Sequence, residues 1–427
     1  MRIAILSVHS SPLAHLGGKE AGGMNVYVRE MARELARRGM LVDIFTRYQD
    51  RTLSTVVPLA PGVRVINLPT GPAVPYDKNW VLTYLPEFVS RLRCFADGED
   101  LVYDVIHSHY WLSGEAGIRL RRSWGIPLVH MFHTLGVMKN QVARSSEETE
   151  TTQRIAIEGR LLRAADAVVA ATPLDRAQMV WHYGADAERI HVIPCGVDLQ
   201  QFQPQSQEAA RRKLGLDPNQ RLLLCVGRME PLKGMDCLIR ALALLQQRQP
   251  AWRDQLRVLL IGGASEEQPD HWNGEQRRLA ALRDELGVTG AVSFIGAQPQ
   301  QLLPDYYAAT DIVVVPSHYE SFGLVALEAL ACAAPVVASD VGGLSSTIED
   351  GRSGFLVPPD NPQALADRLE RLLTDHALRQ QIRHAGYQRA LCYGWDSIAP
   401  RMTLLYDDLI RRGQIRRPAM YQLANVS

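Results

Sequence analysis

Short apolar runs alternate with amphipathic stretches along most of the chain. The apolar runs predict buried strands, and the stretches in which apolar residues recur every three to four positions predict helices. One such helix is expected over residues 24–39, MNVYVREMARELARRG, where a glycine ends the pattern. The strands expected in the first half are 2–8, 41–47, 64–69, 103–110, 127–133, 167–172 and 190–194.

The same alternation starts again after a connector that begins at residue 195. The strands expected in the second half are 221–227, 256–263, 291–296, 311–317, 335–340 and 354–357. Strands that alternate with helices form right-handed βαβ units and parallel sheets covered on both faces. The pattern predicts an α/β fold with two doubly wound, Rossmann-like domains that face a central cleft, and residues 397–412 predict a terminal amphipathic helix.

Composition and charge remove several classes of function. The 427 residues include 46 Lys plus Arg and 46 Asp plus Glu, so net charge offers no argument for a nucleic-acid or anionic-membrane partner. The sequence contains no run of about 18 apolar residues, so no membrane-spanning helix is predicted. The first residues form a strand-and-loop pattern rather than a signal peptide. The six cysteines are scattered, which predicts buried free thiols in a reducing cytoplasm.

Three motifs of common α/β enzymes are absent from the sequence. None of the 32 glycines forms the G-x-G of a dinucleotide fingerprint, and neither a P-loop nor a G-x-S-x-G elbow occurs. Nicotinamide chemistry, nucleotide hydrolysis by a P-loop and serine-elbow hydrolysis therefore fit poorly.

Two loops after strands carry groups suited to phosphate. Gly22 and Gly23 open a helix, whose N–H groups are able to face a phosphate, although an ordinary βα loop has the same composition. Arg228 and Lys233 follow another strand and together match a diphosphate, although an isolated pair of this kind is more often a feature of solvated surfaces.

A third segment, VVVPSHYESFGLVALEALACAAPVVASDVGG, is the most specific. A buried strand ends at Pro316, a loop carries Glu320, Phe322 and Gly323, and a helix with Glu328 follows. The helix start presents N–H groups to a phosphate, and carboxylates accept hydrogen bonds from sugar or ribose hydroxyls.

Taken in order along the chain, these segments resemble the retaining nucleotide-sugar glycosyltransferases of the GT-B type, the group called family 4. The segments that carry the resemblance are the N-terminal glycine loop, HSHYWLSG, FHTLG, IPCGVD, VGR with LKG, and ESFGLVALEA. It implies a GT-B architecture with an acceptor domain over 1–197, a nucleotide-sugar domain over 198–396, and a segment 397–427 whose helix packs back on the first domain.

The resemblance also implies roles for residues in the second domain and at the glycine loop. Glu320 would contact the transferred sugar, Glu328 the ribose hydroxyls, and Arg228 with Lys233 the diphosphate. His133 by itself fits a packed histidine at a strand end better, but the resemblance implies that it lies beside the donor sugar. The catalytic set is then His133, Arg228, Lys233 and Glu320, and the donor-binding set is Gly22, Gly23, Arg228, Lys233, Glu320, Phe322, Gly323, Leu324 and Glu328. Neither a metal nor a cofactor is expected, and the pair His107 and His109 is expected to form hydrogen bonds rather than a zinc site.

For the acceptor, the resemblance points to a phosphate site in the first domain. The implied residues are Asn25, Lys78, Tyr110, Thr134, Lys139 and Arg154. Two kinds of relative compete: GGMNVYV resembles inositol-phosphate glycosyltransferases, which use UDP-N-acetylglucosamine, whereas KNWVLTYLPEFV resembles sucrose-phosphate synthases, which use UDP-glucose and fructose 6-phosphate. The sequence narrowly favours the second.

Two other classes stay open at this point. A nucleotide-sugar-modifying, dehydrogenase-like enzyme would carry bound nicotinamide cofactor. A non-catalytic sugar-binding protein with two α/β lobes would be exported. The donor sugar, the nucleotide base and the oligomeric state are not determined by the sequence.

Overall fold

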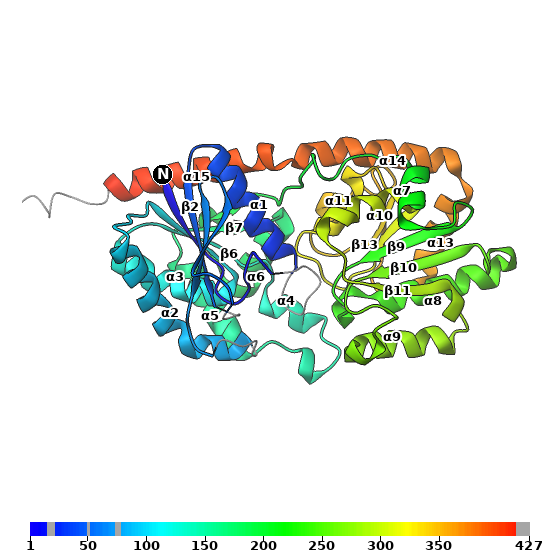
Figure 1. Ribbon diagram of the computed structural model, residues 1–427, viewed down its shortest axis with the longest axis horizontal. Helices are drawn as coiled ribbons and strands as arrows, with labels where there is room; N and C mark the ends of the chain where they lie inside the picture. Colours follow the sequence, from blue (N-terminus) through cyan, green and yellow to red (C-terminus); the bar gives the residue numbers. More distant parts are fainter. Residues whose placement is uncertain (15–21, 49–51, 73–77, 416–427) are drawn as a thin grey trace, which may run out of the picture.

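The computed structural model describes residues 1–14, 22–48, 52–72 and 78–415, and their strands form two separate sheets (Figure 1). Within these ranges the first sheet has eight strands in the order β3-β4-β2-β1-β5-β6-β7-β8. Its strands are β1 (Arg2–Leu6), β2 (Leu41–Arg47), β3 (Val56–Ala60), β4 (Val63–Leu68), β5 (Val105–His109), β6 (Leu128–Met131), β7 (Ala167–Ala170) and β8 (Ile190–Val192).

Helices connect the parallel strands of this sheet. They are α1 (Gly23–Arg37), α2 (Lys78–Gly98), α3 (Tyr110–Trp124), α4 (Gly136–Gln141), α5 (Thr152–Ala164) and α6 (Pro173–Tyr183), with short 3₁₀ turns η1 (Ser146–Glu148) and η2 (Ala187–Arg189). The expected helix over 24–39 corresponds to α1, which ends two residues earlier at Arg37, and a glycine with positive φ, Gly39, follows.

In the part of the chain that is described, the second sheet has six parallel strands in the order β11-β10-β9-β12-β13-β14. These are β9 (Arg221–Val226), β10 (Leu256–Ile261), β11 (Val292–Gly296), β12 (Ile312–Val315), β13 (Val336–Ser339) and β14 (Phe355–Val357). The helices around it are α7 (Gln207–Leu214), α8 (Met235–Arg248), α9 (Gly274–Glu285), α10 (Leu303–Ala309), α11 (Leu324–Ala331), α12 (Leu344–Thr347), α13 (Pro362–Thr374) and α14 (His376–Ala390).

The prediction of two doubly wound sheets is confirmed, with one correction. The strand β3 was not predicted, and it pairs antiparallel with β4 at the edge of the first sheet. Its residues VVPLA include Pro58 and are only partly buried, so they lack the continuous apolar run that marks a central parallel strand. The domain limits 1–197, 198–396 and 397–427 remain a prediction.

The last helix, α15 (Trp395–Ile415), joins the two halves. Figure 1 shows it in orange to red along one side of the molecule, starting near the second sheet and passing α1 of the first half. The buried hydroxyl of Tyr406 forms a 2.6 Å hydrogen bond with Nδ1 of His107 in β5. The return of the terminal helix to the first half is therefore confirmed.

One apolar cluster runs through the contact between the halves. It contains Ile5 of β1 and Leu224 of β9 together with Phe202 and Trp395 from the connecting segments. No helix of the described residues is both long and apolar enough to cross a bilayer. The expectation of buried cysteines was wrong for two of the six, because Cys94 and Cys392 are exposed; the others, Cys195, Cys225, Cys237 and Cys332, are buried, and all six are free.

Candidate active site

The loop between β12 and α11 brings a carboxylate to a lysine from another strand end. Lys233, at the end of the short turn η3 (Pro231–Lys233) after β9, places its Nζ 2.6 Å from Oε2 of Glu320. Both side chains are about four-fifths buried, with exposed fractions of 20% and 19%. Two segments that the sequence placed at one edge of the sheet thus meet there.

The glycine pair Gly342 and Gly343 packs against the loop that carries Glu320. The N–H of Gly343 donates to the carbonyl of Glu320 at 2.7 Å, and Gly342 has φ of 50°. A Cβ on Gly342 would lie 1.9 Å from the same carbonyl oxygen, so only glycine fits. This contact explains why the loop and the later VGG turn occur together.

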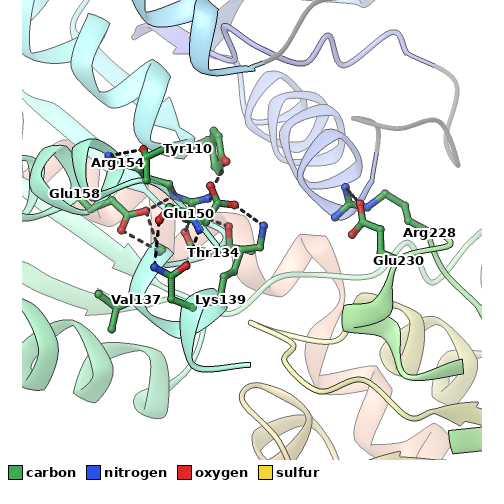
Figure 2. A network of polar contacts seen from close by, with 12 residues as sticks. Tyr110, Thr134, Val137, Lys139, Glu150, Arg154, Glu158, Arg228 and Glu230 are labelled. Carbon is green, nitrogen blue, oxygen red and sulfur yellow. Dashed lines mark hydrogen bonds and ion pairs between the residues drawn. The ribbon is translucent and has the colours of Figure 1, made fainter. Parts of the chain in front are cut away.

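Gly22 and Gly23, at the start of α1, lie close to side chains of the second half. A Cβ on Gly22 would lie 3.8 Å from Nε of Arg228, and one on Gly23 would lie 3.1 Å from Cδ1 of Leu324. Arg228 forms an ion pair with Glu230 at 2.8 Å (Figure 2). The start of α1 therefore lies close to both the Arg228 loop and the start of α11.

Asn25 contributes to this loop rather than to the acceptor cluster. Its Oδ1 accepts from the N–H of Gly22 at 3.1 Å, and its Nδ2 donates to Ser10 and Ser11. These bonds hold the helix start in place. The predicted contact of Asn25 with an acceptor stays a prediction.

The start of α11 is shaped by its neighbours. Gly323 has φ of 91°, a left-handed conformation that disfavours other residues, and it directly precedes the helix. The carbonyl of buried Phe322 accepts from the hydroxyl of Thr347 at 3.1 Å. The first N–H groups of a helix have no partner within it, so the 322–324 backbone offers hydrogen-bond donors near Arg228.

Glu328 lies one turn further along α11 and is buried. Its Oε2 accepts from the hydroxyl of Tyr307 at 2.9 Å. Burial raises the pKa of Glu328 to about 7, although hydrogen bonds from Tyr307 and Gln300 and the charge of Arg29 oppose the shift. Arg29 in turn donates to the side chain of Gln300, which links α1 to the second half.

Glu328 borders a small crevice between the two halves, with room for about one water molecule and partly open to solvent. Its walls come from α1, from the connector after β8, and from α11 and α15. The residues that line it include Val26, Glu30, Gln300, Leu324, Glu328 and Trp395. A Cβ on Gly196 of the IPCGVD segment would lie 2.5 Å from the Trp395 ring, which explains a glycine at that position.

His133 follows β6 and has an unusual backbone conformation, with φ of 62°. Its Nε2 lies 3.0 Å from Nδ1 of His109, whose ring is fully buried. Burial lowers the pKa of His133 to about 3, so its ring is neutral over the physiological range. The hydrogen bonds expected of His107 and His109 are present, the first to Tyr406 and the second to His133.

Three of the residues assigned to the acceptor, Tyr110, Thr134 and Lys139, lie around a fourth, the buried Arg154 (Figure 2). Arg154 has no exposed surface; it donates to the hydroxyl of Tyr110 at 2.9 Å and to Oγ1 and the carbonyl of Thr134 at 3.1 and 2.8 Å. Lys139 reaches the same place through Glu150, which accepts from Lys139 Nζ at 2.5 Å and lies 2.9 Å from Arg154. Lys78 is the first residue of α2, and its side chain lies outside the described part.

Comparisons with known proteins agree with this geometry. The Glycosyltransferase Family 4 model matches residues 21–201, and the Glycosyl transferases group 1 model matches residues 206–389. A D-inositol 3-phosphate glycosyltransferase of Nocardiopsis dassonvillei is 42% identical over 409 residues, 95% of this chain and 94% of that protein. The chain belongs to the family 4 glycosyltransferases.

Solved structures show the same fold for this glycosyltransferase. The sucrose-phosphate synthase from Thermosynechococcus elongatus is 36% identical, with a TM-score of 0.87 over 96% of this chain and 99% of that one. Anabaena HepE, solved with UDP and glucose, has a TM-score of 0.73 at 24% identity over 96% of this chain and 100% of that one, which is a likeness of fold alone. The predicted GT-B architecture is confirmed.

Several residues of this glycosyltransferase's site were not found from sequence. Glu158 accepts from Arg154 at 2.7 Å, Glu150 bridges Arg154 and Lys139, and Tyr307 contacts Glu328. The four-residue spacing of Arg154 and Glu158 was a usable signal, because it places both side chains on one face of a helix. Glu150 precedes that helix, so its spacing gave no such signal. Tyr307 had no such signal, because it belongs to another helix.

Proposed function

We propose that this glycosyltransferase moves a sugar, with retention of configuration, from a nucleoside diphosphate sugar to a phosphorylated acceptor. The observation that carries the proposal is the presence of two separate cationic sites. One contains Lys233 and Arg228 in the loop after β9 of the second sheet. The other contains Arg154 of α5 and Lys139 of α4 in the first half. Each suits one of the two anionic substrates.

On the sugar-donor side, the second half supplies charge and the first half supplies a glycine edge. Lys233 and Arg228 are suited to stabilise the negative charge that gathers on the departing diphosphate, together with the N–H groups at the start of α11. Glu320 would accept hydrogen bonds from hydroxyls of the transferred sugar, and Glu328 from the ribose hydroxyls. Gly22 and Gly23 lie close to Arg228 and Leu324, so the N–H groups at the start of α1 would approach the diphosphate from the first half.

The reaction breaks the bond between the anomeric carbon and the β-phosphate oxygen and forms a bond from that carbon to an acceptor hydroxyl oxygen. In a front-face attack the leaving phosphate takes the proton of that hydroxyl, so retention needs no separate protein base. The chain's contribution is to orient the substrates and to stabilise charge. The ring of His133, which is neutral over the physiological pH range, would donate or accept a hydrogen bond at the sugar rather than exchange a proton with it.

On the acceptor side, Arg154 supplies a planar guanidinium that matches phosphate oxygens, and Lys139 a point charge. The hydroxyls of Tyr110 and Thr134 lie beside them. This composition supports phosphate recognition more than recognition of a neutral sugar.

Two acceptors are candidates, and a different observation supports each. The names of the relatives at 41–42% identity favour an inositol phosphate as the acceptor. The resemblance described from sequence pairs that acceptor with UDP-N-acetylglucosamine as the donor. The fold and 36% identity of the sucrose-phosphate synthase favour fructose 6-phosphate with UDP-glucose, the choice that the sequence motifs narrowly preferred. The higher identity of the inositol-phosphate enzymes, 41–42% against 36%, supports the first candidate more strongly.

The test combines both donors with both phosphorylated acceptors and with inositol and fructose as unphosphorylated controls. Product is measured by mass spectrometry, and its anomeric configuration by NMR. We expect transfer to one phosphorylated acceptor with retention, and about a 100-fold or greater loss of kcat/KM for its unphosphorylated form, since several charge-assisted hydrogen bonds are lost. Equal rates with and without the phosphate, or no product from any pair, would contradict the proposal.

A further inference from the structure

A buried carboxylate lies between the two cations of the acceptor cluster. Glu150 follows the largely exposed segment 144–149, yet its own side chain is buried, with an exposed fraction of 8%. Its Oε1 accepts from Lys139 Nζ at 2.5 Å and lies 2.9 Å from a terminal nitrogen of Arg154 (Figure 2). An anionic oxygen thus already occupies the place where both cations converge.

We infer that Glu150 occupies the acceptor-phosphate position in the empty enzyme and leaves it when the phosphate binds. The inference rests on the proposed function, because it uses the same cations. A carboxylate and a phosphate both present anionic oxygens to lysine and arginine, and so they compete for one place. A neutral sugar has no charge with which to displace Glu150, so this exchange selects for a phosphorylated acceptor.

Charge balance explains why the carboxylate must leave. Among the described side chains of this cluster, the carboxylates of Glu150 and Glu158 balance the cations of Lys139 and Arg154. A phosphate brings about 1.5 to 2 further negative charges at pH 7. With both carboxylates in place, that charge would lie unbalanced in a buried site, which is strongly unfavourable.

The same balance explains why a carboxylate is there in the empty enzyme. Arg154 has no exposed surface, and a buried guanidinium without a sufficient counter-charge destabilises the fold. Glu150 lowers that cost until the substrate takes its place.

Glu150 rather than Glu158 is the exchangeable partner. Glu158 lies within α5, is fully buried, and also accepts from the N–H of Gly136 at 2.9 Å and from the hydroxyl of Tyr183. Glu150 precedes the helix, and Asn140 holds its backbone by bonds of 2.6 and 3.2 Å. A rotation of the Glu150 side chain would therefore separate it from Lys139 and Arg154 with its main-chain bonds to Asn140 kept, whereas withdrawal of Glu158 would break its bonds to Gly136 and Tyr183.

The experiment compares the wild type with Glu150→Gln, which has nearly the same shape but no charge. Glu147→Gln is the matched control, because it removes the same charge from an exposed position three residues earlier. Calorimetry with inorganic phosphate is the first measurement. We expect Glu150→Gln to lower the Kd about ten-fold and Glu147→Gln to leave it unchanged.

Steady-state kinetics with the phosphorylated acceptor is the second measurement. Glu150→Gln should lower the KM for that acceptor by a similar factor, with the KM for the sugar donor unchanged. Glu150→Asp, which keeps the charge on a shorter side chain, should give an intermediate value and provides a second variant if the glutamine form folds poorly.

The outcomes separate the exchange of Glu150 from the proposed function. An unchanged or higher phosphate Kd in Glu150→Gln overturns the inference, and if transfer to a phosphorylated acceptor persists, the proposed function survives. A lower phosphate Kd supports the inference even where no phosphorylated acceptor yields product, in which case the proposed function fails instead.

Discussion

Lys233 and Glu320 are 87 positions apart in the chain, and their charged atoms lie 2.6 Å apart. The pair joins the loop after β9 to the loop before α11, and a main-chain hydrogen bond from the N–H of His318 to the carbonyl of Leu232, at 2.9 Å, joins the same two loops. Because both side chains keep about a fifth of their surface exposed, the pair is accessible to solvent and is not sealed in the core.

Replacing either member of this pair is expected to depress transfer strongly. Lys233→Ala removes a cation from the departing diphosphate, and Glu320→Gln weakens the hold on the sugar and on Lys233. Each should lower kcat about 100-fold or more, the range seen when one group that stabilises developing charge is lost. The double variant should lose less than the product of the two effects, because the residues are in contact.

The control for these variants is Lys213→Ala, which breaks a comparable 2.7 Å pair with Asp305 in the same half. Its turnover should match the wild type. Near-normal turnover in both Lys233→Ala and Glu320→Gln would instead remove the pair from the catalytic site.

The raised pKa of Glu328 predicts a pH-dependent stability. In the folded protein this carboxyl holds its proton up to about pH 7, whereas an ordinary glutamate loses it near 4.5. The folded state therefore binds more protons between these values, and the free energy of unfolding falls as the pH rises through this window. Chemical unfolding at pH 5, 6, 7 and 8 should show a smaller fall for Glu328→Gln, with a difference of about 2–3 kcal/mol across the window.

If Glu328 also binds the ribose hydroxyls, its ionised form binds them better. The KM for the nucleotide sugar should then fall as the pH rises from 6 to 8 in the wild type and stay flat in Glu328→Gln. The nucleotide sugar has no ionisation of its own in this range, and a saturating acceptor removes the contribution of the acceptor phosphate. A parallel pH dependence in both proteins would separate Glu328 from the sugar donor.

A methyl group at Gly23 should affect binding but not folding. Gly23 is the first residue of α1, and a Cβ there would lie 3.1 Å from Leu324. Alanine favours the helix by about 0.5–1 kcal/mol, so Gly23→Ala should keep or raise the free energy of unfolding. It should raise the KM for the sugar donor several-fold, because Leu324 at the start of α11 must shift.

Gly274→Ala is the matched control, since Gly274 is the first residue of α9 and a Cβ there has no neighbour within 4 Å. Both variants are measured by chemical unfolding and by donor kinetics. The same KM in the two would show that the Gly23 approach to Leu324 has no role in binding.

The hydrogen bond between Tyr406 and His107 should stabilise the return of α15. Tyr406→Phe leaves Nδ1 of His107 without this partner in a fully buried place, where a lost hydrogen bond costs about 1–3 kcal/mol. Thr403→Ala, which alters a partly buried hydroxyl of the same helix, should change the free energy of unfolding by less than about 0.5 kcal/mol. Equal values for the two variants would contradict the role of Tyr406.

Most of the fold could be predicted because parallel strands leave a local signal. The runs RLLLCV and IVVV are largely buried and almost wholly apolar, and they correspond to β9 and β12. The strand β3 escaped because an edge strand with Pro58 is partly exposed and has no such run. Motif order along the chain likewise predicted the family, which the comparisons confirmed.

The sequence by itself determined the two-sheet fold, the family and the residues at each strand end. Only the tertiary structure decided which of these residues meet: Lys233 with Glu320, Gly23 with Leu324, and Arg154 with Glu150 and Lys139. The reason is physical. Periodicity reports the burial of a residue within its own element, whereas the distance between side chains of different elements depends on the strand order and on how each loop packs against the next.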